Sequence, residues 1–559
     1  MPLKSRWSID IPDASLPTVV FQSPTHPLST TRRSFSDATR PETHYFTTHD
    51  YRLWCLRFAA GLRKSGLRPG DRVMMFSPND LFYPVAFMGI VMAGGVFTGA
   101  NPTYTPRELA YQLKDSGATY LLCADAVIDT GIAAAKSIGM SLDRVFVFNS
   151  ALYDGKGNGL KGTRYWGELV ASKEEGSRFS WDPLTGPGQA KDRLLALNYS
   201  SGTTGVPKGV EITHRNYVAN LLQFNHLATL DPEYEQKRRS ARFLCFLPMY
   251  HAMAQNIFIS SALVREIPVY IMARFDFIQM LEHIQKFRIT DLILVPPIAI
   301  ALTKHPAVKN YDLSSIRYLG SGAAPLGMEV TQELEKMFSH KFHVRQGWGM
   351  TETTLSLLGW DPNMKGTSIS VGELNANCEA KIMAEDEVTE LGRNQRGEIW
   401  VRAPNIMRGY WGKPEATRDT LTPDGWLKTG DIGYVDDSGM FFIVDRKKEL
   451  IKVKGNQVAP AELESLLLDH PAVADAAVIG VAKDGDEYPR AYITLKPGKT
   501  ATEADIVNYM KDKVAPTKRI TGGVVFIDAI PRNPSGKILR KVLRDRAAQE
   551  LKQGVTAKL

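Results

Sequence analysis

Cysteine is scarce in this chain, which has four among 559 residues: Cys55, Cys123, Cys245 and Cys378. They lie far apart and mostly in apolar surroundings, so they form neither a metal-binding spacing nor a disulfide framework, and a reducing compartment is expected. Residues 1–12 lack the apolar core of a signal peptide, so secretion is not expected.

Strong charge bias and long apolar runs are also missing. The formal charge of +8 is modest for this length and favours a mildly basic surface over a nucleic-acid partner. One uncharged stretch, residues 81–100, approaches the length of a membrane span, but Pro84 and the pair Gly94-Gly95 favour a buried helix, a turn and a strand. We expect a soluble protein, and its length requires at least two domains.

Helix and strand patterns alternate in the first part of the chain. Apolar residues recur at helical spacing over 50–70, and a strand pattern follows at 72–77. The next patterns are helix 82–92, strand 95–98, helix 106–116 and strand 119–124. This alternation predicts an α/β fold with a parallel sheet covered on both faces. The polar, Gly/Pro-rich segments 153–163 and 172–191 are interpreted as surface loops.

The most informative stretch is Asn-Tyr-Ser-Ser-Gly-Thr-Thr-Gly-Val-Pro-Lys-Gly-Val at 198–210, which follows a buried-strand pattern at 194–197. Four hydroxyl side chains and three glycines lie within ten residues, with Lys208 near the end. Backbone N–H groups, hydroxyls and one ammonium suit a loop that wraps a polyphosphate. The spacing is not that of a Walker A loop, and Pro207 precedes the lysine, so a phosphate site of another kind is predicted.

This loop resembles that of the adenylate-forming superfamily, which includes acyl- and aryl-CoA ligases, firefly luciferase and peptide-synthetase adenylation domains. Five further motifs follow in the family's order, so the resemblance covers most of the chain, from about Tyr51 to Leu543. They lie at 318–327, 346–352, 424–431, 445–460 and 531–538.

The resemblance implies a nucleotide site for ATP and AMP. In it the ring of Trp348, where the family more often has tyrosine, would stack on adenine, Asp431 and Arg446 would hold the ribose, and Glu352 would bind Mg²⁺. One carboxylate is chemically sufficient, because Mg²⁺ also takes phosphate oxygens and water. The implied ATP- and AMP-binding residues are Ser200, Ser201, Gly202, Thr203, Thr204, Lys208, Ala324, Gln346, Gly347, Trp348, Thr351, Asp431, Arg446 and Lys448.

The resemblance also implies the groups that act on the acyl chain. Lys537 would neutralise charge between the substrate carboxylate and the α-phosphate, and His251 would close the carboxylate pocket. Lys452 and Gln457 would approach the acyl-adenylate. The implied residues for coenzyme A are Arg274, Lys454 and Gly455. A lone lysine or histidine is more often structural, so these assignments depend on position in the series of motifs.

Two domains follow from the same resemblance. Residues 1–445 would form a large N-terminal adenylation domain of packed α/β sheets, and residues 446–559 a small mobile α+β lid with its hinge near Lys448. Because Lys537 and Lys454 lie on different loops, rotation of the lid would present each in turn.

The acyl substrate is less constrained. The pattern is most similar to plant 4-coumarate–CoA ligases and fungal relatives, but Met253 stands where they have a tyrosine, and Leu355-Ser356 where they have Pro-Val. An aromatic or medium-chain acid is therefore expected. The candidate pocket residues are Tyr250, Met253, Lys304, Gly322, Met350 and Leu355.

Three alternatives remain open: a luciferase-like oxygenase, a ligase that loads a carrier protein, and a non-enzymatic binding protein. Lys454-Gly455 and Arg274 favour free CoA over a carrier protein. A binding protein would be expected to have lost Lys537, Glu352 or Asp431, and all three are present. The tripeptide Ala557-Lys558-Leu559 matches the small-basic-leucine form of the peroxisomal address, so we expect recognition by the peroxisomal import receptor.

Overall fold

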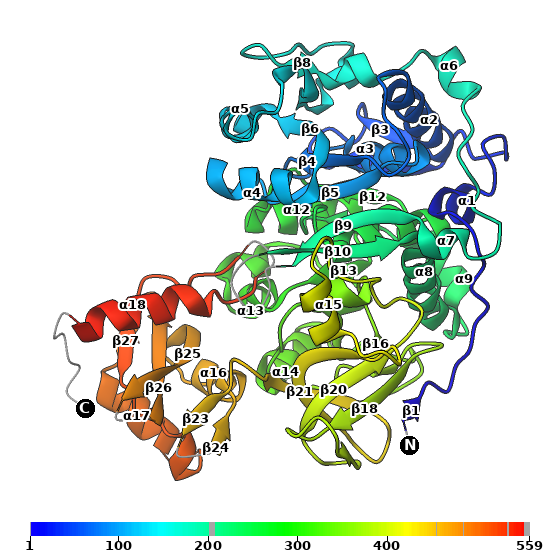
Figure 1. The fold of residues 1–559 in the computed structure, drawn as a ribbon. Helices are drawn as coiled ribbons and strands as arrows, with labels where there is room; N and C mark the ends of the chain where they lie inside the picture. The colour runs from blue at the N-terminus through cyan, green and yellow to red at the C-terminus, as the bar shows by residue number, and fades with distance from the viewer. Residues whose placement is uncertain are drawn as a thin grey trace.

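The computed structural model describes residues 2–200, 207–453, 456–483, 486–511, 513–533 and 536–552. A large N-terminal part contains two seven-stranded sheets and one six-stranded sheet, and a small α+β part follows at the C-terminal end (Figure 1). The predicted fold class is confirmed.

The first seven-stranded sheet has the order β10-β9-β5-β4-β6-β7-β8. Its central strands are parallel, and β9 with β10 forms an antiparallel pair at one edge. Its strands are β4 (Arg72–Phe76), β5 (Val96–Ala100), β6 (Ala118–Ala124), β7 (Val145–Phe148), β8 (Arg164–Tyr165), β9 (Leu194–Ser200) and β10 (Lys208–Thr213). The helices that follow the predicted pattern are α2 (Thr48–Lys64), α3 (Tyr83–Met92) and α4 (Pro106–Ser116), and α5 (Ile128–Ser137) lies after β6.

One of the two predicted loops contains more structure than the sequence pattern indicated. Within 172–191 the chain forms α6 (Lys173–Ser177) and reaches α7 (Gln189–Asp192). Ser172 and Glu175 form a reciprocal capping box, which satisfies the first backbone N–H groups of α6 and stabilises so short a helix.

The second seven-stranded sheet has the order β15-β14-β13-β11-β12-β2-β3 and is parallel except for its β2–β3 pair. Its strands are β2 (Arg33–Asp37), β3 (Tyr45–Thr47), β11 (Phe243–Cys245), β12 (Val269–Ile271), β13 (Asp291–Leu294), β14 (Tyr318–Ser321) and β15 (Arg345–Gln346). The sequence of residues 293–297 favours a strand that ends in two prolines, but the observed strand ends at Leu294, and Pro296 and Pro297 begin α13 (Pro296–Lys304). Proline is tolerated in the first helical turn because N–H groups there have no intrahelical partner.

Other helices of the N-terminal part cover these two sheets and connect their strands. They are α1 (Leu16–Phe21), α8 (His214–Thr229), α9 (Tyr234–Ser240), α10 (Ala252–Ala254), α11 (Ala262–Val264), α12 (Phe277–Phe287) and α14 (Met328–Met337). The helix α15 (Pro414–Thr420) instead precedes and contacts a strand of the third sheet, β21 (Leu427–Val435). A π-helical turn, Gln255–Ser261, joins α10 to α11.

The third sheet is antiparallel and has the order β1-β18-β20-β21-β22, with β19 paired to β18. Its strands are β1 (Leu3–Lys4), β18 (Glu379–Met383), β19 (Glu390–Leu391), β20 (Gly397–Arg402), β21 (Leu427–Val435) and β22 (Phe441–Arg446). A two-stranded ladder joins β16 (Leu358–Gly359) to β17 (Glu373–Leu374). The N-terminal segment thus pairs with a strand nearly four hundred residues later.

The C-terminal part has its own buried clusters, separate from the main core. Its elements are β23 (Ile451–Val453), β24 (Asn456–Val458), α16 (Pro460–Leu468), β25 (Val473–Lys483), β26 (Asp486–Leu495), α17 (Glu503–Lys511), β27 (Val524–Phe526) and α18 (Arg540–Lys552). Since β22 runs across the predicted boundary between residues 445 and 446, the boundary itself stays a prediction.

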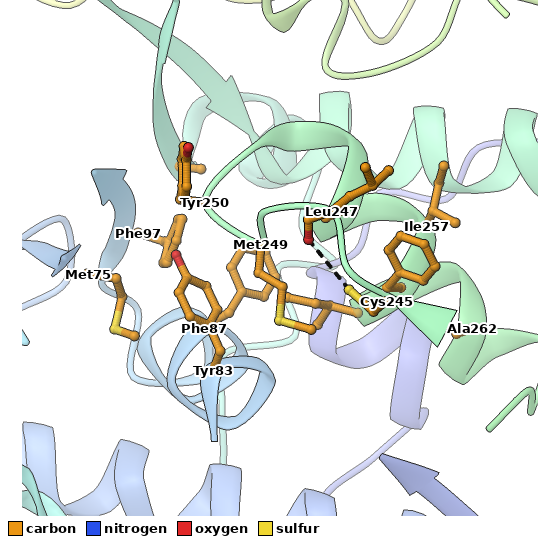
Figure 2. Close-up of a cluster of buried hydrophobic side chains, with 14 of the residues drawn as sticks. Met75, Tyr83, Phe87, Phe97, Cys245, Leu247, Met249, Tyr250, Ile257 and Ala262 are labelled. Carbon is orange, nitrogen blue, oxygen red and sulfur yellow. Dashed lines mark hydrogen bonds between the residues drawn. The ribbon is translucent and has the colours of Figure 1, made fainter. Parts of the chain in front are cut away.

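The two large sheets share a core of aromatic and thioether side chains. Figure 2 shows Tyr83, Phe87 and Phe97 packed near Met249 and Tyr250, and the Phe87 and Phe97 ring centroids are 5.0 Å apart. This core anchors the segment that leads to His251. All four cysteines are buried free thiols. Among the helices described, none combines the length and apolarity that a membrane crossing requires.

Candidate active site

The ends of the predicted phosphate loop are held together by strand pairing. Ser200, the last residue of β9, lies opposite Lys208, the first of β10. The Ser200 hydroxyl is buried and, within the described part of the chain, has no hydrogen-bond partner. Residues 201–206 lie outside the described residues, so the roles of Ser201, Gly202, Thr203 and Thr204 stay predictions.

Lys208 does not extend freely from its strand. Its ammonium nitrogen lies 4.8 Å from the centroid of the Tyr410 ring. A cation in this position is attracted by the electrons of the ring face. The side chain of the lysine that is expected to meet the β- and γ-phosphates therefore has a defined position, over the Tyr410 ring.

Glu352 lies in a 3-10 turn, Thr351–Thr353, and is only 5% exposed. Its Oε1 accepts a hydrogen bond of 2.9 Å from the Tyr410 hydroxyl. The described residues contain no group of three or more His, Cys, Asp or Glu side chains that could hold a metal alone. A single carboxylate beside the phosphate-loop strands fits Mg²⁺, which would complete its shell with phosphate oxygens and water.

The resemblance assigns the motif at 318–327 to the adenine side of the nucleotide site, and its loop follows β14. Ala323 has a φ of 72°, a left-handed conformation that is uncommon for a residue with a side chain and that clusters at functional sites. The Gln346 side chain binds Leu326 at both backbone groups, accepting from its N–H at 2.8 Å and donating to its carbonyl at 3.0 Å. Gln346 thereby fixes the far end of the loop that carries Ala324.

Trp348 and Asp431 are joined directly. The indole Nε1–H donates to the Asp431 Oδ2 at 2.8 Å, and both residues are buried. Arg446, opposite Asp431 in the β21–β22 pair, brings its Nε to 3.4 Å from Oδ1. Burial raises the pKa of Asp431, whereas Arg446 and the Trp348 N–H oppose the rise. The residues predicted for adenine and ribose thus form one connected group.

Lys537 joins this group from the C-terminal part. Its pKa is lowered to about 8, first by burial and then by the nearby charge of Arg446, while Asp431 acts in the opposite direction. Lys448 also has a pKa of about 8, mainly through burial, with Arg446 and Lys537 contributing. The Lys537 backbone N–H is held by the Asn533 Oδ1 at 2.8 Å.

The loop that carries Lys537 packs against the N-terminal part. A Cβ added at Gly536 would lie 3.1 Å from Val295 and 3.3 Å from Pro297, at the start of α13. Gly536 has a φ of 80°, which glycine adopts without strain. The Lys537 loop of the small domain therefore packs on the large domain, close enough for the charge of Lys537 to act on Asp431.

Two predicted catalytic residues are not brought to this place. Lys452 and Gln457 face each other in the β23–β24 ladder, and Lys452 is exposed. In Figure 1 this hairpin lies at the other end of the small domain from the segment that approaches α13. Lys454 and Gly455 lie outside the described residues, and Arg274 is an exposed residue shortly after β12.

His251 precedes α10 and is half-buried at the edge of the core. Burial lowers its pKa to about 4, so the ring is neutral near pH 7. Its centroid is 4.4 Å from that of Tyr250, whose buried hydroxyl has no hydrogen-bond partner among the residues described. Met253 follows on α10, and its sulfur lies 3.7 Å from the position of a Cβ on Gly322. These contacts bring the His251 segment to the adenine loop.

The other predicted pocket residues, Met350, Leu355 and Lys304, belong to segments other than the one that carries His251. Met350 and Leu355 are half-buried beside the Glu352 turn. Lys304 ends α13, where burial lowers its pKa and the neighbouring charges include Lys496 and Asp469 of the small domain. These neighbours place Lys304 at the interface of the two domains, and its contact with an acyl group stays a prediction.

Sequence reasoning gave Tyr410 no role, although the structure connects it to both Lys208 and Glu352. Its position in the run Gly409-Tyr410-Trp411 is visible in the sequence, but nothing in that run indicates which carboxylate the hydroxyl meets. The signal is spatial, because 58 residues separate Tyr410 from Glu352.

Comparison with known proteins agrees with this geometry. The family profile of the AMP-binding enzymes matches residues 29–411, and that of the AMP-binding enzyme C-terminal domain matches residues 462–537. The 4-coumarate–CoA ligase 1 of Petroselinum crispum is 38% identical over 510 residues, which cover 90% of this chain and 89% of the relative. Phenylacetyl-CoA ligase epaB of Aspergillus niger is 36% identical over 501 residues, 89% of this chain and 90% of the relative.

A solved structure shares the arrangement of both domains. The ATP-bound MatB from Rhodopseudomonas palustris superimposes with a TM-score of 0.80 at 27% identity, and the match covers 95% of this chain and 98% of that one. Together with the two profile matches and the motif order, this shows that the chain belongs to the AMP-binding enzyme family, the adenylate-forming group that its motifs resemble.

Proposed function

We propose that the chain is an AMP-forming ligase that activates an aromatic carboxylic acid with ATP and transfers the acyl group to coenzyme A. The observation that carries the proposal is the approach of the Lys537 loop to the large domain: Gly536 packs against Val295 and Pro297, and the charge of Lys537 acts on Asp431. A cation that a small domain brings to a nucleotide site suits a reaction between two anions, because it reduces the repulsion between them.

In the first half-reaction the substrate carboxylate attacks the α-phosphorus of ATP, an acyl-adenylate forms and pyrophosphate leaves. Both reactants are negatively charged, so catalysis consists mainly of positioning and charge neutralisation. Lys537 would lie between the carboxylate and the α-phosphate, and Lys208 would hold the β- and γ-phosphates. Mg²⁺ bound at Glu352 would supply further positive charge to the phosphate oxygens.

In the second half-reaction the CoA thiol attacks the acyl carbonyl, a thioester forms and AMP leaves. In the observed arrangement the Lys537 loop lies next to the nucleotide site, whereas the β23–β24 hairpin lies far from it (Figure 1). This arrangement suits the first half-reaction. Rotation about Lys448 would withdraw Lys537 and bring in Lys452, Gln457 and the CoA-binding residues. The neutral ring of His251 would be free to move without breaking an ion pair.

An aromatic acid is supported by the names of two relatives, whose substrates are coumarate and phenylacetate. In this chain Met253, an apolar and adaptable side chain, faces Gly322, where the absence of a Cβ leaves room beside the sulfur. This apolar space would also accept a medium-chain acid, which the test therefore includes.

The test is release of AMP from ATP and Mg²⁺ with a panel of cinnamic, arylacetic, benzoic and medium-chain acids, each with and without CoA. CoA-dependent AMP release with one aromatic acid is the expected result. Exchange of pyrophosphate without thioester would identify another acceptor, oxygen or a carrier protein. Preference for a medium-chain acid would overturn the aromatic assignment, and no AMP release from any acid would overturn the ligase assignment.

We also propose that Ala557-Lys558-Leu559, which lies outside the described residues, directs import into peroxisomes. The address requires a free carboxyl group at Leu559, which mass spectrometry of the native protein can check. A fluorescent protein fused ahead of residues 548–559 should then enter peroxisomes, and the same fusion without the tripeptide should stay outside them. Equal distribution of the two fusions would refute the proposal.

A further inference from the structure

Residues 408–411 form an additional strand-like segment beside β10. The Arg408 N–H donates to the Glu211 carbonyl at 3.0 Å, the Glu211 N–H to the Gly409 carbonyl at 2.9 Å, and the Trp411 N–H to the Gly209 carbonyl at 2.8 Å. Three backbone hydrogen bonds fix the register of this segment against the strand that leaves the phosphate loop, with Tyr410 opposite Val210.

From this fixed backbone the Tyr410 side chain reaches both groups assigned to the triphosphate. Its hydroxyl donates to the Glu352 Oε1 at 2.9 Å, and the ammonium of Lys208 lies 4.8 Å from the centre of its ring. The Glu352 backbone is tied to the same segment, because its carbonyl accepts from the Met407 N–H at 2.9 Å. One side chain thus touches a carboxylate and a cation that are 144 residues apart in the sequence.

Packing alone does not account for a hydroxyl at this position. A phenylalanine would provide the same ring face to Lys208 and the same apolar contacts. The hydroxyl adds a hydrogen bond to a nearly buried carboxylate, which selects one rotamer of Glu352 out of several. The bond uses Oε1, and in the described part of the chain no donor reaches Oε2. That oxygen is therefore available to a cation.

We propose that Tyr410 is a positioning residue for the metal and the triphosphate: its hydroxyl orients the Glu352 carboxylate toward Mg²⁺, and its ring holds the Lys208 ammonium where the β- and γ-phosphates bind. This inference rests on the proposed use of ATP and Mg²⁺. Partners that orient a metal ligand commonly contribute a factor of about ten to one hundred in metal affinity. An ordered lysine also loses less side-chain freedom when a phosphate binds.

The experiment is calorimetric titration of the full chain with ATP, without acid or CoA, in excess Mg²⁺ and in EDTA. Tyr410→Phe should weaken binding about tenfold in Mg²⁺ and leave binding in EDTA unchanged, because the ring stays beneath Lys208. Tyr410→Leu should weaken binding in both conditions. Trp411→Phe is the matched control, because Trp411 is the next residue of the same segment and stacks with Arg72 instead. This variant should bind ATP with unchanged affinity both in Mg²⁺ and in EDTA.

A loss of affinity in Tyr410→Phe that is equal with and without Mg²⁺, no loss at all, or the same loss in Trp411→Phe would each overturn the inference. Unchanged ATP affinity of Tyr410→Leu in EDTA would also overturn the inference, because it would show that the ring does not position Lys208. If ATP binding to the unsubstituted protein does not depend on Mg²⁺, the proposed metal role of Glu352 fails instead. AMP, which lacks the β- and γ-phosphates, should bind all variants equally.

Discussion

The indole N–H of Trp348 donates a 2.8 Å hydrogen bond to the carboxylate of Asp431, so the ring predicted to contact adenine also orients the group predicted to hold the ribose. An indole has its N–H at the edge of the ring system, whereas a tyrosine has its hydroxyl at the far end of the ring. A tyrosine whose ring lay in the same plane and place would have its hydroxyl elsewhere, so it could not make this hydrogen bond to Asp431. Tryptophan at this position joins two parts of the nucleotide site that would otherwise be oriented separately.

Replacement of Trp348 by Phe should raise the KM for ATP about ten- to hundredfold, because an aromatic ring remains while a hydrogen bond to a charged group, worth about 1.5–3 kcal/mol, is lost. The KM values for the acid and for CoA should stay within a factor of two or so, since neither ligand meets Asp431. The assay is AMP release at varied ATP.

A double-substitution cycle separates this role from a general loosening of the site. If Trp348 acts through Asp431, Trp348→Phe should have little further effect on a chain that already carries Asp431→Ala. Fully additive effects of the two substitutions on the KM for ATP would show that Trp348 acts by another route.

Substitution of Lys537 by Ala should abolish adenylation, because it removes the cation that the Lys537 loop brings within electrostatic range of Asp431. Thioester formation from supplied acyl-adenylate should be spared, since Lys537 would be withdrawn in that step. The two half-reactions are measured separately by pyrophosphate exchange and by CoA consumption. Lys541→Ala, on an exposed residue of α18, is the control, and equal loss of both half-reactions in Lys537→Ala would contradict the assignment.

The rate of adenylation should fall as the pH rises through about 8. Lys537 acts as a cation, and burial lowers its pKa to about 8, so the charged form is lost above that pH. Lys537→Arg should remove this decline even if its maximal rate is lower, because a guanidinium stays charged. Lys448 has a similar pKa, so Lys448→Arg is the necessary comparison: the decline should persist in that variant if Lys537 causes it.

The parts of the structure that could be predicted are those with local causes. The alternation of α2, β4 and α3 follows from periodic apolar residues within each segment. For the site, motif order gave the expectation that Asp431 and Lys537 act together, and in the structure the charge of Lys537 acts on Asp431. The end of β13 was misjudged because two prolines are compatible with either a strand end or a first helical turn. The partners within the site could not be predicted. No periodicity shows that Trp348 bonds to a carboxylate 83 residues away, because that contact depends on how two sheets pack.

His214 allows a prediction for stability at low pH. This residue begins α8, is buried, and accepts a 3.1 Å hydrogen bond at Nδ1 from the Leu16 N–H, so it joins the N-terminal segment to the core. Burial and the nearby Arg193 lower its pKa from 6.5 to about 3. Between these two values the unfolded chain binds the proton and the folded chain does not. The contribution of neutral His214 to the free energy of unfolding is therefore fully present above pH 6.5. It decreases as the pH is lowered, by up to about 1.4 kcal/mol per pH unit.

In His214→Asn the side-chain oxygen can still accept from Leu16, but the group no longer titrates. The variant should be less stable than the unsubstituted chain at pH 7.5, because packing is lost, and the difference in the free energy of unfolding should shrink as the pH falls to 5. Denaturant unfolding at several pH values, followed by tryptophan fluorescence, measures this difference.

His251, whose pKa burial also lowers, contributes equally to both chains, so its effect cancels in the difference. His49→Asn, at a ring that is 43% exposed, is the control and should show no such trend. A stability difference for His214→Asn that stays constant from pH 7.5 to 5 would mean that the buried imidazole is not the group that senses acid.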